Sequence, residues 1–306
     1  MNVVVAGSLN FDLVVHLDRM PNPGETVAGE EIHTYPGGKG LNQAVSVARS
    51  NVRANMIGAL GDDPNSVALF AVLKSEGINS DQIQRVAGAC GTAIIEVDKN
   101  GQNRIVVIPG ANDALNSRAL PKTYFQDFSG KKILLCQLES PVAQIIKVIE
   151  IAKSSGFLIL LNPAPAMDLT RELLSMIDIL IPNQHESEIL TGIKVLNLES
   201  ARLAALKLIG RGVQAVIVTL GDVGALYISK EEEIFQSAFT VDPIDTTAAG
   251  DAFCGAFAAE LARGKNSADA LQYACAAGAL ATTKKGAVQS IPREIDIRAL
   301  VGSQVS

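Results

Sequence analysis

Short apolar runs alternate with amphipathic stretches along most of the chain. The runs from Asn2 to Ser8 and over 133–136 have the length and continuity of strands buried on both faces. Apolar residues at helical spacing occur over 41–50 and 142–152. This alternation predicts an α/β fold of three α/β/α layers, in which helices cover both faces of a mostly parallel central sheet.

Two segments, residues 12–36 and 90–110, do not follow this pattern. The strand-like stretches 92–97 and 104–108 flank Asn100 and Gly101, a pair that strongly favours a hairpin turn. Residues 26–35 mix polar and apolar positions without a helical period, as in a half-exposed strand pair. We therefore expect one domain, residues 1–306, in which these two segments form a small β-sheet lid.

Composition excludes several classes of protein. The 306 residues are 48% hydrophobic and 19% charged, with a net charge of −6 and no run of Lys or Arg, which argues against nucleic acid or an anionic membrane as partner. The first residues predict a buried strand rather than a signal peptide, and no stretch has about 18 consecutive apolar residues, so a cytoplasmic location is expected. The four cysteines and three histidines are scattered, which favours reduced thiols and gives little support to a zinc site or a Ser-His-Asp triad.

The chemistry-bearing stretch is 245–251, which leads directly into a helical pattern. Ala248, Ala249 and Gly250 are small, so their backbone N–H groups could approach an anion at the start of that helix. Asp251 beside them could accept the proton of an attacking alcohol, the arrangement that phosphoryl transfer requires. The alternative is a capped helix that packs closely on a sheet, and this motif alone does not decide between the two.

Two further motifs lie early in the chain. Asn10 and Asp12 are two residues apart in an extended segment, so they share a face and could hold neighbouring hydroxyls, although for this motif taken alone an Asx turn is the better explanation. Residues 37–44, with three glycines and Asn42, could bring backbone against a ligand, or could be a hinge before a capped helix.

Two more motifs each follow an apolar strand. Asn183 and Glu186 are one helical turn apart and could order waters around magnesium, or could be an N-cap and a solvated carboxylate. The glycine-containing stretch 219–224 could wrap the phosphates of a nucleotide, or could be a hairpin turn.

In this order, and over nearly the whole chain, the five motifs resemble the ribokinase family of sugar kinases, the PfkB superfamily. The resemblance implies a ribokinase-like fold and transfer of phosphate from ATP to O5 of D-ribose, with Asp251 as general base and residues 248–251 as the anion hole. It implies sugar contacts at Asn10, Asp12, Gly38, Lys39, Gly40, Asn42, Glu139 and Asp251. It implies nucleotide contacts at Asn183, Thr219, Leu220, Gly221, Asp222, Val223, Gly224, Gly250 and Asp251.

The resemblance also implies two cations. Magnesium would be bound through water by Glu186. Potassium would be held largely by backbone carbonyls beside the phosphate site, and would stiffen the turn that stabilises the transferring phosphoryl group. The matching positions for potassium are Asp245, Thr247, Ala281, Lys284, Gly286 and Ser290.

The chain departs from the family pattern at two positions. Ala248 stands where many relatives have glycine, and Cys275 lies near the expected adenine site, where an Asn or His is common. Because a thiol donates hydrogen bonds weakly, base recognition would rest on apolar contact, and the choice of ATP over GTP is left open.

Partner and substrate are also expectations. The family pattern and the half-exposed face of the small sheet predict a homodimer formed through two lids. Alternatives to ribose are fructose, deoxyribose or a nucleoside such as adenosine. A non-catalytic sugar or nucleotide sensor is the alternative from another class, and the presence of Asp251, Asn183 and Glu186 argues against it.

Overall fold

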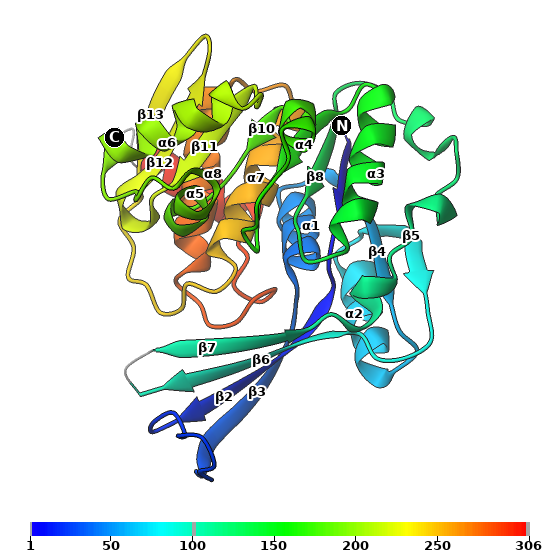
Figure 1. The fold of residues 1–306 in the computed structure, drawn as a ribbon, viewed down its shortest axis with the longest axis vertical. Helices are drawn as coiled ribbons and strands as arrows, with labels where there is room; N and C mark the ends of the chain where they lie inside the picture. Colours follow the sequence, from blue (N-terminus) through cyan, green and yellow to red (C-terminus); the bar gives the residue numbers. More distant parts are fainter. Residues whose placement is uncertain (1, 100–101, 304–306) are drawn as a thin grey trace.

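The computed structural model describes residues 2–99 and 102–303 (Figure 1). Within these residues the main body contains a nine-stranded sheet. In order across the sheet its strands are β13 (Glu233–Ser237), β12 (Gly224–Ser229), β11 (Ala215–Thr219), β10 (Ile179–Leu180), β9 (Leu158–Leu161), β8 (Lys132–Cys136), β1 (Asn2–Ala6), β4 (Arg53–Leu60) and β5 (Asn79–Arg85).

Every strand pair from β11 to β5 is parallel, and β12 and β13 add an antiparallel hairpin at one edge. The parallel strands are apolar because both faces of the sheet are covered by helices. β1 shows this directly: Val3 and Val5 pack into the core on one face, and Val4 and Ala6 pack into the core on the other.

Helices from distant parts of the sequence form each covering layer. The layer on the Val3 side contains α1 (Lys39–Arg49), α2 (Pro64–Ser75), α7 (Ala249–Ala262), α8 (Ser267–Ala281) and α9 (Glu294–Ser303). The opposite layer contains α3 (Val142–Ser154), α4 (Arg171–Met176), α5 (Gln184–Thr191) and α6 (Leu198–Gly210). The predicted three-layer α/β fold is therefore confirmed, and no helix of the described residues has the length and hydropathy needed to cross a membrane.

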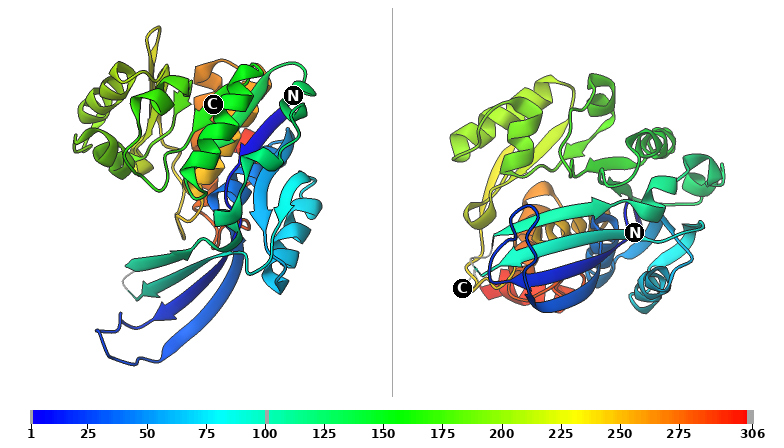
Figure 2. Two further views of the ribbon diagram at one scale, coloured as in Figure 1. Left: turned by 45° about the vertical axis from the view of Figure 1, so that its right-hand side comes forward. Right: turned by 60° about the horizontal axis from the view of Figure 1, so that its bottom comes forward.

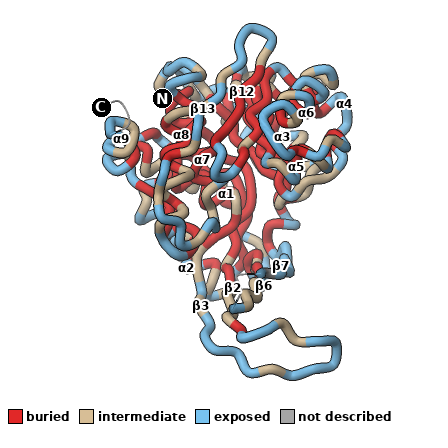
Figure 3. Tube along the Cα trace, turned by 90° about the vertical axis from the view of Figure 1, so that its left-hand side faces the viewer, coloured by how far each residue is buried: buried red, intermediate tan, exposed pale blue. Residues whose placement is uncertain are grey.

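A small four-stranded sheet projects from one end of the main body (Figures 1 and 2). It has the order β3 (Gly29–Gly37), β2 (Asn10–Leu17), β6 (Gly91–Asp98) and β7 (Asn103–Ile108). Much of its surface is exposed, in contrast to the buried core of the main body (Figure 3). The strands predicted over 92–97 and 104–108 are confirmed as β6 and β7, whereas the predicted turn at Asn100 and Gly101 lies outside the described residues.

The sequence pattern missed or misplaced several elements. β5 has no apolar run because, as an edge strand, only Ile83 of its seven residues is buried. Of the apolar run over 177–181, only the two residues of β10 form a strand. The short helices α4 and α9 were also missed, since each buries only one or two side chains and shows no long periodic pattern.

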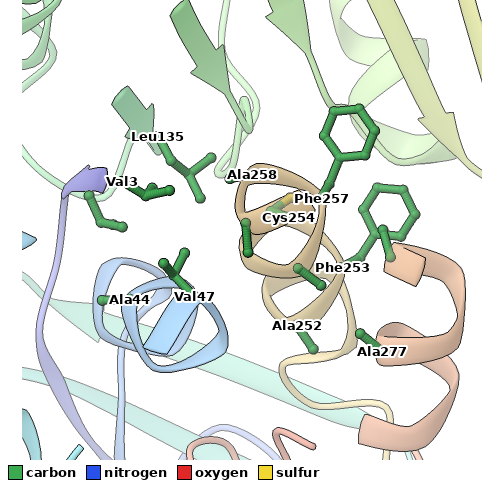
Figure 4. Close-up of a cluster of buried hydrophobic side chains, with 14 of the residues drawn as sticks. Val3, Ala44, Val47, Leu135, Ala252, Phe253, Cys254, Phe257, Ala258 and Ala277 are labelled. Atoms are coloured by element: carbon green, nitrogen blue, oxygen red, sulfur yellow. The ribbon is translucent and has the colours of Figure 1, made fainter. Parts of the chain in front are cut away.

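α1 and α7 lie side by side and pack through small residues, Ser46 of α1 and Gly255 of α7 (Figure 4). A β-carbon at Gly255 would lie 2.5 Å from Ser46 Cβ and 2.6 Å from the carbonyl oxygen of Gln43. The Ser46 hydroxyl donates to the carbonyl oxygen of Ala252 at 2.8 Å. Gly255 therefore sets how closely the two helices can approach.

We predict that Gly255→Ala lowers the free energy of unfolding by roughly 1–3 kcal/mol, because the added methyl group forces two packed helices apart. Urea unfolding measures this change. Gly210→Ala is the matched control, since Gly210 is also helical but has open space where a β-carbon would lie. Equal stability of the two variants would contradict the importance of this contact.

Candidate active site

Asp251 lies in the first turn of α7 and is 7% exposed. Its Oδ2 accepts a hydrogen bond from Asn42 Nδ2 at 2.9 Å, and its Oδ1 accepts one from Gln43 Nε2 at 3.0 Å. Both donors are on α1, so the close packing of the two helices brings the glycine-rich motif and the late motif together. Gly40 contributes to this arrangement, because a β-carbon there would overlap the backbone of Gly7 and Ser8.

The backbone before Asp251 presents N–H groups. Ala248 caps α7 in the left-handed conformation, with φ of 60°, and has no side chain that could cap the helix. The Ala249 N–H donates to the carbonyl oxygen of Thr246 at 3.2 Å, whereas the amides of Gly250 and Asp251 have no acceptor among the described residues. Gly250 is exposed, and nothing lies within 4 Å of the position its β-carbon would take. Two amides without an internal partner at the start of a helix are suited to bind an anion.

Lys39 is the cation of a cluster of acids beside Asp251. Its Nζ lies 3.9 Å from Glu139 Oε1. Burial lowers the pKa of Lys39, but the negative charges of Asp251, Glu139 and Glu186 outweigh this effect and raise it, so the amine stays charged. Burial also raises the pKa of Asp251, and this is opposed by Lys39 and by the hydrogen bonds from Asn42 and Gln43.

Glu139 and Asp12 complete this cluster. Glu139 Oε2 accepts from the Ser8 hydroxyl at 2.6 Å and from the Lys39 backbone N–H at 3.1 Å. Asp12 is 8% exposed and has no hydrogen-bond donor among the described residues. Burial first, and then repulsion by Glu139 and Asp251, raise the pKa of Asp12 to about 7. A buried carboxyl without a protein donor is suited to accept from a ligand hydroxyl.

Asn112 holds Asn10, and sequence reasoning missed it. Asn112 Oδ1 accepts from the Leu9 backbone N–H at 2.9 Å, and its Nδ2 donates to the Leu9 carbonyl oxygen at 3.2 Å and to Asn10 Oδ1 at 2.7 Å. Because the backbone fixes the amide of Asn112, Asn10 must turn its own NH2 group away from Asn112. Asn112 lies in a single 3-10 turn, Gly110–Ala114, and no motif marks it.

A cavity of about 550 Å³ lies on the other side of the Gly250 turn. Five of the predicted nucleotide positions and Cys275 line it: Thr219, Gly221, Asp222, Gly224, Gly250 and Cys275. The other predicted nucleotide positions, Asn183, Leu220, Val223 and Asp251, are not part of its lining, although Asn183 pairs with Thr219 in an isolated bridge. Ala249, which the sequence placed in the anion-binding motif, also lines the cavity. Sequence reasoning missed the remaining apolar walls, which were not predicted as site residues: Ala238, Phe239, Val241, Pro243, Phe253, Gly278 and Ala279.

Asn183 and Glu186 form a capping box at the start of α5. Asn183 Oδ1 accepts from the Glu186 N–H, and Glu186 Oε2 accepts from the Asn183 N–H, each at 2.8 Å. Glu186 is nevertheless 8% exposed, and burial raises its pKa. Its second carboxylate oxygen has no donor among the described residues, so it can accept from a metal-bound water as well as cap the helix. No group of three His, Cys, Asp or Glu residues in the described parts of the chain has the geometry of a direct metal site.

The Asp245 carboxylate joins the two segments expected to bind a monovalent cation. Its Oδ1 accepts from the Thr247 N–H at 2.9 Å and from the Thr247 hydroxyl at 2.6 Å, and its Oδ2 accepts from the Gly286 N–H at 2.9 Å. Four backbone carbonyls in these segments accept no hydrogen bond from the described residues: those of Asp245, Thr247, Lys284 and Gly286. Free carbonyls on two bridged segments fit a cation that prefers backbone oxygens.

The sequence and the fold both match known proteins. Residues 1–294 match the family model described as pfkB family carbohydrate kinase. A ribokinase of Schizosaccharomyces pombe is 39% identical over 97% of this chain and 96% of its own length, and a deoxyribokinase of Salmonella typhi is 35% identical over 95% and 96%.

A solved structure of an Arabidopsis thaliana ribokinase with ribose and ATP has a TM-score of 0.88 and 32% identity, and the match covers 98% of both chains. This match confirms the expected ribokinase-like fold, in addition to the three-layer arrangement described above. With its five motifs gathered around one turn, the chain belongs to the pfkB family of carbohydrate kinases.

Proposed function

We propose that this protein transfers the γ-phosphoryl group of ATP to O5 of D-ribose, giving ribose 5-phosphate and ADP. One observation carries the proposal. Asp251 and the free amides of Gly250 and Asp251 lie between a nucleotide-sized cavity and a cluster of acids and amides that suits a polyhydroxylated ligand. The ribokinase relatives, and the solved ribokinase that holds ribose and ATP, support this choice of substrates.

Each part of the site has a role in the proposed reaction. Asp251 accepts the proton of the O5 hydroxyl as that oxygen attacks phosphorus. The amides at the start of α7 hold the phosphoryl oxygens, where negative charge develops in the transition state. Asn10, Asp12, Lys39, Asn42 and Glu139 bind the sugar hydroxyls.

The nucleotide occupies the cavity, and its base lies among apolar walls and Cys275. Burial raises the pKa of Cys275 to about 12, so this thiol stays neutral against the base. Glu186 would hold magnesium through water, and magnesium would neutralise charge on the phosphates.

The small sheet acts as a lid over the sugar. Residues paired across its strands share a face, so Asn10 and Asp12 face the site, and Leu13, Ile94 and Val106 lie on the opposite face. We define the apolar lid face as Leu13, Val15, Ile32, Ile94, Val106 and Ile108. Ile32 and Val106 are 61% and 58% exposed, so this face is suited to pack against a second copy in a homodimer.

Product identification tests the substrate. The protein is incubated with MgATP and, separately, with ribose, 2-deoxyribose, fructose and adenosine, and ADP is measured together with the phosphorylated product. We expect the highest kcat/KM with ribose. A higher value with 2-deoxyribose would instead make the chain a deoxyribokinase like its Salmonella relative.

We predict that Asp251→Asn lowers kcat by about 10²- to 10⁴-fold, the usual contribution of a general base, and leaves ATP binding nearly unchanged. Steady-state kinetics and calorimetric titration of ATP measure the two effects. Asp269→Asn, at an exposed position of α8, is the control. Near-normal turnover of the Asp251 variant would remove this residue from the base role.

We predict faster turnover in potassium than in sodium at equal ionic strength, because potassium would be held by the free carbonyls of the two segments that Asp245 bridges. The measurement compares kcat in the two chlorides, together with the melting temperature, since a bound ion also stabilises the fold. Identical rates and melting temperatures would contradict a potassium site here.

We predict that Val106→Glu converts a dimer into a monomer, because it places a charge within the apolar lid face, beside Ile94. Sedimentation velocity at micromolar concentration measures the oligomeric state. Ile189→Glu is the control, since Ile189 is 48% exposed on α5, far from the lid in the fold. A wild-type monomer would contradict the dimer.

A further inference from the structure

Two consecutive residues of α1 donate to the same carboxylate, but only one of them has a hydrogen-bonding group left for a ligand. Asn42 Nδ2 binds Asp251 Oδ2, and Asn42 Oδ1 is buried and has no partner among the described residues, so one acceptor of this side chain is still unused. Gln43 has no such group. Its Nε2 donates to Asp251 Oδ1 at 3.0 Å and to Asn162 Oδ1 at 3.3 Å, and its Oε1 accepts from Gln137 Nε2.

The orientation of the Gln43 amide follows from its neighbours. An ionised carboxylate only accepts hydrogen bonds, so Gln43 must turn its NH2 group to Asp251 and its oxygen to Gln137. Asn162 is fixed in turn, because its Nδ2 donates to the Ile181 carbonyl oxygen at 3.0 Å. Gln137 has room only because residue 7 is glycine, since a β-carbon there would overlap Gln137 Oε1.

The Gln43 and Gln137 side chains are completely buried, and Asn162 is 9% exposed. A buried amide is costly, above all where one of its polar atoms lacks a partner, as Gln137 Oε1 does among the described residues. An apolar side chain of the same volume would fill the space without that cost. The three amides form a chain that leads from the loops after β8 and β9, through α1, to one oxygen of Asp251. These hydrogen bonds hold the carboxylate from the side of α1 and the central sheet. The turn at Gly250 stays open toward the cavity.

We propose that Gln43 is a positioning residue, which fixes the Asp251 carboxylate in the orientation that reaches the acceptor hydroxyl. The inference rests on the proposed phosphoryl transfer at Asp251. Gln43 touches neither sugar nor nucleotide, so it acts only through Asp251, and the Gln137 and Asn162 amides act through Gln43.

Charged and titratable groups face Asp251 from several elements. They are Lys39 of α1, Asp12 of β2, Glu139 after β8, Glu186 of α5 and Cys254 of α7. Hydrogen bonds from Gln43 and Asn42 favour the ionised form of Asp251 and lower its pKa against the effect of burial. Loss of the Gln43 donor therefore raises the pKa of Asp251, and the acidic limb of the rate profile moves to higher pH.

The test variant is Gln43→Met, which keeps the length of the side chain and removes both the donor and the acceptor. Gln137→Met is the second variant, because it leaves Gln43 in place but without its anchor. Asn55→Leu is the matched control, since Asn55 is also a buried amide near β1, where it donates to the Val3 carbonyl oxygen at 3.3 Å and does not touch Asp251. Urea unfolding establishes that each variant is folded.

We expect Gln43→Met to lower kcat on the order of 10- to 100-fold, the effect of a misplaced catalytic group. We expect the KM values for ribose and ATP to change less than about threefold, and the acidic limb of the kcat/KM profile to move upward. Gln137→Met gives a smaller change of the same kind. Asn55→Leu alters stability alone.

Two outcomes would overturn the proposal. One is a folded Gln43→Met enzyme with the kcat and pH profile of Asn55→Leu. The other is a fall in rate with an unmoved pH profile and raised KM values, which would mean a structural role. If Gln43→Met does not fold, Gln137→Met is judged by the same two criteria.

The wild-type enzyme is assayed in the same series. Absence of wild-type turnover on ribose would contradict the proposed substrate rather than the role of Gln43. In that case the same comparison of variants is made with the sugar that the wild type does phosphorylate.

Discussion

The close contact between α1 and α7 is the constraint on which the site depends. Gly255 lets the helices approach, Ser46 joins their backbones, and Asn42 and Gln43 then reach Asp251 across the gap. These residues are about 210 positions apart in the chain. A separation of the helices by the width of one methyl group would break the hydrogen bonds that orient the carboxylate. The packing of the core therefore determines the geometry of the candidate site. This explains why the alanine-rich pattern of α7 and α8 bears on function although, of those alanines, only Ala249 and Ala279 line the cavity.

The sequence predicted much of this structure because its strongest signals are local. Buried parallel strands are continuous apolar runs, so β1 and β8 were expected near their observed bounds. The edge strand β5 was missed because one buried residue, Ile83, carries no periodic signal. The strand-end motifs were found for the same local reason, since glycines and polar residues interrupt apolar runs where the sheet ends.

The supporting residues of the site could not be found in this way. Asn112, Gln137 and Asn162 are single amides in unremarkable sequence, and their roles exist only because folding brings them to Asn10 and Gln43. The apolar cavity walls from Phe239 to Pro243 follow β13 without any motif, because contact with a flat ring needs only apolar surface at the right place. Glu186 differs from these residues, because the local sequence did predict one of its contacts. The local interpretation as a helix cap is correct, and the same carboxyl is also buried among charged groups that lie far from it in sequence.

The charges of the site divide it into two regions that suit two different ligands. The region of Asp12 and Glu139 contains more carboxyl groups than cations, and Lys39 compensates only part of their charge. A neutral polyol, which donates hydrogen bonds to carboxylates, is favoured there, whereas a polyphosphate is repelled. The cavity beyond Gly250 has apolar walls and backbone amides, which accommodate a base and phosphate oxygens without a fixed negative cluster. Gly250 and Asp251 lie at the boundary between the two regions. In the proposed reaction, the residue that offers an open amide to the anion is followed by the residue that accepts a proton from the alcohol, so the two reactants would meet at this turn.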